Sequence, residues 1–231
     1  ASLDLVSDAD IIRWLEEDKA VNLQCAARAY FHTKAKYRGV AWLEEVVVSA
    51  GLGVEGRLAL AASIPTEEKF WNCIEKYDDA FVAAYWSNVN CHEIPEAQCV
   101  EAISLLLAHE RPWRALDVLF RLKCSGELSV DSATVIDVLN ACLAVQENFD
   151  RSHYSYVVSE LLKWLEVVAP EDLLLPWLEF CYFDFIGGDH DPSFALYSLL
   201  GNVPEEFVSL VRLIDRGQHE LGKARTEGDV A

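Results

Sequence analysis

Three glycines, Gly51, Gly53 and Gly56, have the spacing of a phosphate-binding loop and follow an apolar run at 46–48. A dinucleotide site needs a strand before such glycines and a helix after them, because the backbone must approach a pyrophosphate at the helix N-terminus. The alternative is a helix over 42–50, with Gly51 and Gly53 forming its C-terminal cap and turn. We favour the turn, because no acid ends a second strand about 20 residues further on.

Metal-ligating residue types occur in two places. Cys91, His92 and Cys99 could converge on a zinc ion, but a closed zinc site needs a fourth ligand and the sequence nominates none. The loop at 187–191 carries carboxylates that could bind a cation weakly, although Asp191 is more simply explained as the N-cap of the next helix. We therefore expect structural roles for these residues, with no metal and no cofactor.

Paired acids stand at 67–68, 78–79 and 205–206. They fall at predicted helix starts, whereas general acid–base catalysis needs two carboxylates that face each other across a cleft. The sequence also lacks a Walker-type phosphate loop and a G-x-S-x-G nucleophile motif. We expect a protein that is not an enzyme, with no catalytic residues.

A long acidic tract is the clearest charge feature. Nine acids and no Lys or Arg occur between Leu165 and Val211, whereas the one dense basic segment lies at 32–38. A tract of this kind is either a solvated face or a surface that steers a basic partner. The candidate partner-binding residues are Glu166, Glu171, Asp172, Asp184, Asp189 and Asp191.

The composition is that of a globular protein: of 231 residues, 52% are hydrophobic and 25% are charged. The 38 acidic against 19 basic side chains give a formal charge of −19, which disfavours nucleic acid and anionic lipid as partners. No apolar run approaches the roughly 18–20 residues that span a bilayer. Four of the seven cysteines sit among apolar residues, as buried free thiols do, so we expect a reducing cytoplasm. These four are Cys25, Cys73, Cys142 and Cys181.

The chain contains no Met. Either the chain is an internal piece of a larger protein or modified Met residues are absent from the printed sequence.

The apolar periodicity is helical nearly everywhere, which predicts an all-α fold. Gly39 should end a helix over 19–37. Thr66 should cap the helix that carries Phe70, Trp71 and Ile74. Pro95 and Pro112 should each open a helix, because proline suits the first helical position. Further helices are expected at 131–145, 153–168, 171–185, 192–200 and 204–216. The short connections favour stacked antiparallel helix pairs.

A partial sequence repeat, called the internal echo below, supports such a stack. The segments 112–120 and 192–200 share the pattern P-x-x-A-L-x-x-L-[FL], and a degenerate middle copy near 155–162 would give a period of about 40 residues. We predict an α-α superhelix or solenoid, with an irregular bundle as the alternative. The expected domains are N-terminal helices (1–64) packed on the main body, a helical-repeat domain (65–218) and a polar tail (219–231).

Five short sequence motifs occur one after another across this helical region. They are Phe70-Trp71, Tyr85-Trp86, Arg111-Pro112 with Ala115-Leu116, Leu178-Glu179-Phe180, and Pro204-Glu205-Glu206-Phe207. Over roughly 64–216 this order resembles the C-terminal helical-repeat region, TPR- or HEAT-like, of large bacterial multidomain proteins, some of them similar to STAND-type NTPases linked to phage defence. The resemblance implies a scaffold or sensor module whose nucleotide chemistry lies in another domain, and it carries over no catalytic residue.

The segment 103–144 also looks like pentatricopeptide repeats. Such repeats bind RNA along a basic track, which the net charge of this chain disfavours. We therefore expect a non-catalytic protein–protein interaction, sensor or scaffold module, part of a larger bacterial protein. The alternative is a nucleotide- or small-molecule-binding helical domain that uses the Gly51–Gly56 loop.

Overall fold

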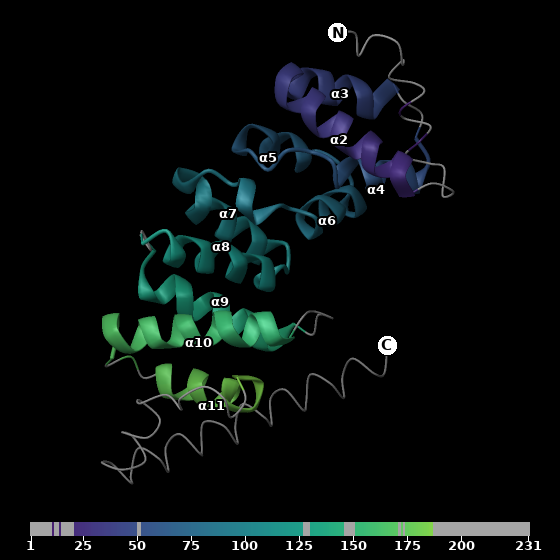
Figure 1. The fold of residues 1–231 in the computed structure, drawn as a ribbon. Helices are drawn as coiled ribbons and strands as arrows, with labels where there is room; N and C mark the ends of the chain where they lie inside the picture. The colour runs from purple at the N-terminus through teal and green to yellow at the C-terminus, as the bar shows by residue number, and fades with distance from the viewer. Residues whose placement is uncertain are drawn as a thin grey trace, which may run out of the picture. The chain divides into compact units, whose positions relative to one another are not determined.

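The computed structural model describes residues 11, 14, 21–49, 52–126, 130–145, 151–170, 172 and 174–186 (Figure 1). Every regular element in these ranges is a helix and none is a strand, so the all-α prediction is confirmed. The chain divides into two compact units, Ala1–Leu128 and Ser129–Ala231. The boundary expected at 64–65 lies within the first unit, and the repeat domain over 65–218 stays a prediction.

The first unit contains seven α-helices and two 3-10 turns in its described part. They are α2 (Val21–Arg38), α3 (Val40–Ser49), α4 (Val54–Ala61), α5 (Glu68–Ile74), α6 (Asp79–Ser87), η2 (Cys91–Glu93), η3 (Glu96–Gln98), α7 (Cys99–Ala108) and α8 (Pro112–Cys124). Helices α2 and α3 pack on each other, as do α7 and α8, which is the neighbour packing that short connections predict. Helix α4, in contrast, packs mainly on α6.

The second unit contains α9 (Ser132–Ala144), α10 (Arg151–Val168) and α11 (Leu175–Ile186) in its described part. Helix α10 packs on α11, and α9 contacts both. The buried phenol of Tyr182 on α11 donates a hydrogen bond to the Leu139 carbonyl of α9 at 2.7 Å, which ties these two helices together. The helices expected at 192–200 and 204–216 lie outside the described residues, and so does the second copy of the internal echo.

Local signals place most helix ends correctly. Gly39 ends α2 with φ +79°, a left-handed conformation that glycine adopts without strain. Pro112 is the first residue of α8. Asp131 caps α9 by accepting a hydrogen bond from the Thr134 backbone N–H at 2.7 Å. Pro95 is followed first by the 3-10 turn η3, and α7 begins only at Cys99.

Two expectations about single residues are wrong. Thr66 does not cap α5: Glu67 takes the N-cap position, and the buried Thr66 hydroxyl donates instead to the Asn90 carbonyl at 3.3 Å. Cys25 is exposed on α2, since the buried side of that helix is formed by other residues such as Ala27 and Phe31. Cys73 and Cys142 are buried as predicted, whereas Cys181 is only partly buried.

Candidate functional site

The acidic tract is described at its beginning, in the second unit. Glu166 lies in the last turn of α10 and is half-buried. Asp172 lies in the connection to α11, where its carboxylate accepts the Leu174 backbone N–H at 2.9 Å. Asp184 belongs to α11, and the candidates Glu171, Asp189 and Asp191 lie outside the described residues. The structure therefore places Glu166 at the end of α10 and Asp172 within the connection that follows, and it leaves the other four candidates as predictions.

One acid of the tract is not on the surface. Glu179 on α11 is only 2% exposed, between the buried Leu178 and the exposed Phe180. A run of acids in sequence does not reveal this, because on a helix the side chains turn by about 100° per residue and successive positions face different surroundings. Glu179 is thus a core residue of the second unit and cannot meet a partner directly.

Apolar side chains accompany the acids at the α10–α11 connection. Val167 is 79% exposed, Val168 48% and Leu174 41%. The backbone there is held by hydrogen bonds, such as that from the Ala169 N–H to the Leu165 carbonyl at 2.8 Å. We call Glu166, Val167, Val168, Asp172 and Leu174 the α10–α11 turn surface. Its acids were evident in the sequence. The exposure of its valines was not, although Val167 and Val168 stand at the expected end of a helix, where side chains are less often buried.

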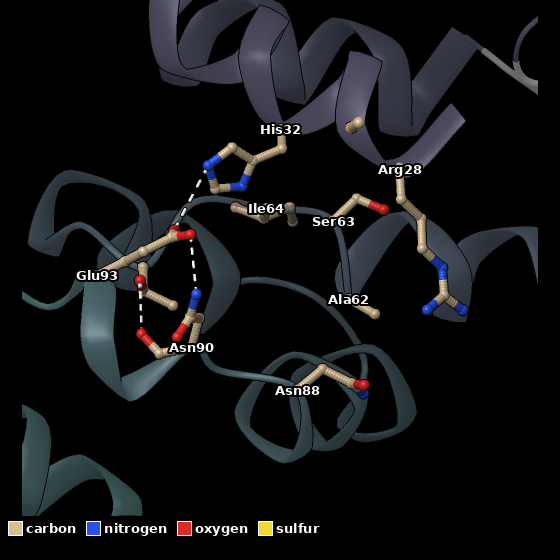
Figure 2. Close-up of a pocket in the computed structure, with 10 residues that line it drawn as sticks. Arg28, His32, Ala62, Ser63, Ile64, Asn88, Asn90 and Glu93 are labelled. Atoms are coloured by element: carbon tan, nitrogen blue, oxygen red, sulfur yellow. Dashed lines mark hydrogen bonds and ion pairs between the residues drawn. The ribbon is translucent and has the colours of Figure 1, made fainter. Parts of the chain in front are cut away.

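A polar pocket of about 240 Å³ lies within the first unit (Figure 2). It is bounded by α2, by the segment after α4 and by the segment between α6 and η2. Its lining is formed by Arg28, Ala29, His32, Ala62, Ser63, Ile64, Thr66, Asn88, Asn90 and Glu93. The sequence drew attention to Thr66 only as a helix cap and to His32 only as part of the basic segment. It did not indicate a pocket, because the lining residues are separated by up to 65 positions and belong to no motif.

A hydrogen-bonded chain forms one side of this pocket. The Asn90 amide caps η2 by accepting the His92 backbone N–H at 3.2 Å and donates to the Glu93 carboxylate at 2.9 Å. The other oxygen of that carboxylate lies 3.4 Å from His32 Nε2, so Glu93 connects η2 to α2. Figure 2 shows Arg28 and His32 both extending from α2 toward the segment that carries Ala62, Ser63 and Ile64.

The glycine-rich loop lies between two helices. Gly53 is the N-cap of α4, with φ −63° and ψ 175°, and Gly56 is a buried residue inside that helix. Gly51 is outside the described residues. Helix α3 occupies the place of the strand that a dinucleotide fingerprint requires. The geometry therefore favours a turn between helices, and nucleotide binding at this loop stays a prediction.

Arg121 contacts two of the three residues that were considered as zinc ligands. Its guanidinium donates to the His92 carbonyl at 3.1 Å and to the Cys99 sulfur at 2.6 Å. The Cys91 thiol donates to the Arg114 carbonyl at 3.4 Å. Within the ranges that the structure describes, no three His, Cys, Asp or Glu side chains come together as a metal site would need. Cys91 and Cys99 are buried and each contacts a residue of α8, whereas His92 is exposed.

Burial also controls the chemistry of the thiols. It raises the pKa of Cys91 to about 12 and that of Cys181 to about 11, and it raises the pKa values of Cys73 and Cys99 as well. Because the thiolate is the nucleophilic form, these four cysteines are poorly suited to covalent chemistry at neutral pH.

Comparison of the chain with protein-family models, with curated proteins and with solved structures finds no match. The described helices include none that is both long and apolar enough to cross a membrane.

Proposed function

We propose that the chain is a non-catalytic protein–protein interaction module, serving as a scaffold or sensor within a larger bacterial protein in the cytoplasm. Its docking site is the α10–α11 turn surface, and its partner is a basic protein segment or a basic part of its own parent chain. One observation carries the proposal: Val167, with 79% of its side chain exposed, lies between acids on a stretch that contains no Lys or Arg.

The mixed chemistry of this surface supports a docking role. Burying a valine side chain completely contributes about 1.5–3 kcal/mol, which an exposed Val167 can gain only by contacting another molecule or segment. The carboxylates of Glu166 and Asp172 favour a partner with Lys or Arg around an apolar centre, since complementary charge raises association rates and selects partners. Glu171, Asp184, Asp189 and Asp191 join the proposal through the sequence, as further acids of the same tract.

The net charge of −19 supports a protein partner over nucleic acid, because phosphate binding requires clustered cations. The raised pKa values of Cys91 and Cys181 agree with a module in which neither thiol acts as a nucleophile.

Affinity capture with matched baits tests the proposal. The full chain is compared with a variant carrying Glu166→Gln, Asp172→Asn and Val167→Ser, and with a control carrying Glu101→Gln and Asp137→Asn. The control removes the same number of charges from exposed positions on α7 and α9. Lysate of the source cell is applied, bound protein is eluted with a salt step, and the eluate is identified by mass spectrometry.

We expect one stoichiometric protein that the wild-type chain and the control capture and the triple variant loses. Equal capture by all three baits would place the docking site elsewhere on the chain and would contradict the assignment of the α10–α11 turn surface.

A further inference from the structure

Helix α2 differs in charge from the rest of the chain. Its 18 residues include four Lys or Arg and no Asp or Glu, whereas the chain as a whole has 38 acids and 19 bases. Its own unit, residues 1–128, contains 20 acidic against 13 basic side chains, a formal charge of −7. A basic helix in an acidic unit therefore needs an explanation of its own.

Three basic residues of α2 share one face. Arg28, His32 and Lys36 are spaced four apart, and residues at i, i+4 and i+8 follow one another along a helix surface. His32 meets the Glu93 carboxylate at 3.4 Å, and Lys36 meets that of Glu67 at 4.0 Å. Two positions of this basic row thus face a carboxylate of the same chain.

Arg28 is the third position of the row. It is exposed, it lines the polar pocket, and no carboxylate of a described residue forms an ion pair with it. A guanidinium presents its N–H donors in a planar fork that matches a carboxylate with two parallel hydrogen bonds. Asn88 lines the same pocket and uses one amide N–H for the Ala84 carbonyl, which leaves a second N–H and the amide oxygen for a ligand.

We propose that this face of α2 docks an acidic segment of a protein partner in an extended conformation, with one side-chain carboxylate bound by Arg28 at the pocket. A second carboxylate of the segment lies over Lys36, which is 60% exposed despite its contact with Glu67. Eight helical residues separate Arg28 from Lys36 by about 12 Å. Four residues of extended chain cover about 13 Å, so the recognised pattern is acid-x-x-x-acid.

The partner is acidic because the row is basic, and it is a peptide because two carboxylates at this separation occur readily along one extended chain. This inference concerns the first unit and does not depend on the α10–α11 turn surface of the second. Long-range repulsion from the other acids of the chain falls off within about 10 Å at 0.1 M salt, and a carboxylate in direct contact with Arg28 lies well inside that distance.

The test uses the full chain and a capped peptide, acetyl-Gly-Glu-Ser-Ser-Ser-Glu-Gly-amide, in isothermal titration calorimetry at 0.1 M salt. We expect measurable binding by the wild-type chain, a loss of affinity of about tenfold or more in Arg28→Gln, and a change below twofold in Lys76→Gln. Lys76 is an equally cationic, exposed control in the same unit, and its carboxylate contact is with Glu44. Thermal unfolding of each variant verifies that the fold is retained.

Two further peptides identify the source of the carboxylate. The capped peptide with both Glu replaced by Gln should not bind. The same Gln peptide with a free C-terminus should also fail, because the site takes side-chain carboxylates; binding of this peptide at the affinity of the Glu peptide would overturn the proposal.

Binding of the Glu peptide that is equal in wild type and Arg28→Gln, or absent in both, would likewise overturn it. Sedimentation velocity provides an independent check, because a dimer that is present in wild type and lost in Arg28→Gln would make a second copy of the chain the occupant and contradict the assignment to a separate partner.

Discussion

Glu75 and His109 meet across 34 residues of sequence, with Glu75 Oε1 2.9 Å from His109 Nε2. The same oxygen accepts the indole N–H of the buried Trp86 at 3.1 Å, and the His109 ring stacks on Trp86 with centroids 5.2 Å apart. Glu75 and His109 are the C-cap residues of α5 and α7, and Trp86 belongs to α6. One carboxylate oxygen therefore connects three helices.

Replacing Glu75 by Ala should lower the free energy of unfolding by about 1–3 kcal/mol, because the buried indole N–H of Trp86 would lose its acceptor. Urea denaturation followed by tryptophan fluorescence measures the change. Glu45→Ala is the control, since Glu45 is exposed on α3. A cost no larger than that of the control would show that the Glu75 contact contributes nothing to stability.

Glu110 has φ +57° and is exposed, immediately after the α7 cap. This left-handed conformation costs a residue with a Cβ roughly 1–2 kcal/mol, and glycine avoids that cost while losing more chain entropy on folding. Glu110→Gly should therefore raise the free energy of unfolding by up to about 1 kcal/mol. Glu110→Val, measured in the same thermal or urea unfolding series, should lower it. The reverse order would contradict the backbone assignment.

Asp131 gives the second unit an acid-sensitive helix start. Hydrogen bonds from the Thr134 side chain and backbone hold the pKa of its carboxyl below the usual value. A lowered pKa in the folded state stabilises the fold above the unfolded-state value near 4, and this stabilisation is lost as the pH falls through the folded-state value.

In Asp131→Asn the amide oxygen can still cap α9 but does not titrate in this range. We expect similar stability to wild type at pH 6 and a smaller loss of stability between pH 5 and pH 2. Urea denaturation at each pH provides the measurement, and identical pH profiles would contradict a titrating cap.

Cysteine accessibility distinguishes surface from core. Cys25 and Cys124 are exposed, whereas Cys91 and Cys142 are buried. Brief treatment of the native chain with iodoacetamide should alkylate the first two and spare the second two, because the second two thiols are inaccessible and burial also raises the pKa of Cys91. Peptide mass spectrometry before and after denaturation locates the label. Rapid native labelling of Cys142 would show that the second unit opens readily.

Nucleotide binding at the Gly51–Gly56 loop has its own measurement. A ligand present at 100 times its dissociation constant stabilises the folded state by about 2.7 kcal/mol and raises the unfolding midpoint. Because α3 stands where the fingerprint needs a strand, we expect neither NAD nor ATP to shift the midpoint of the chain. A shift that disappears in Gly53→Val would establish the nucleotide-binding alternative.

Helix ends set by local chemistry could be predicted from the sequence. The fixed φ of Pro112, the carboxylate of Asp131 and the left-handed conformation of Gly39 each act on neighbouring backbone groups, so a few residues contain the whole signal. Thr66 failed as a cap because its hydroxyl meets Asn90, 24 positions away. That contact depends on packing that no local pattern encodes.

In the candidate sites, too, some features are visible in the sequence and others depend on packing. The acidity of the α10–α11 turn surface was evident in the sequence, but the exposure of Val167 and the burial of Glu179 depend on which helix faces α10 and α9 cover. The basic segment at 32–38 was also evident. Arg28 was not, because its importance comes from the segments after α4 and α6 that close the pocket around it.

The single residue between α2 and α3 makes this junction intolerant of changes in length. Gly39 alone separates Arg38, which ends α2, from Val40, which begins α3, and its N–H bonds to the Ala35 carbonyl at 2.8 Å. An added residue would lengthen this one-residue link, and the turn at Gly39 that keeps Leu43 of α3 in the interior would have to change. Insertions and deletions at this junction should therefore be excluded from functional relatives of the chain, even where the surrounding sequence diverges freely.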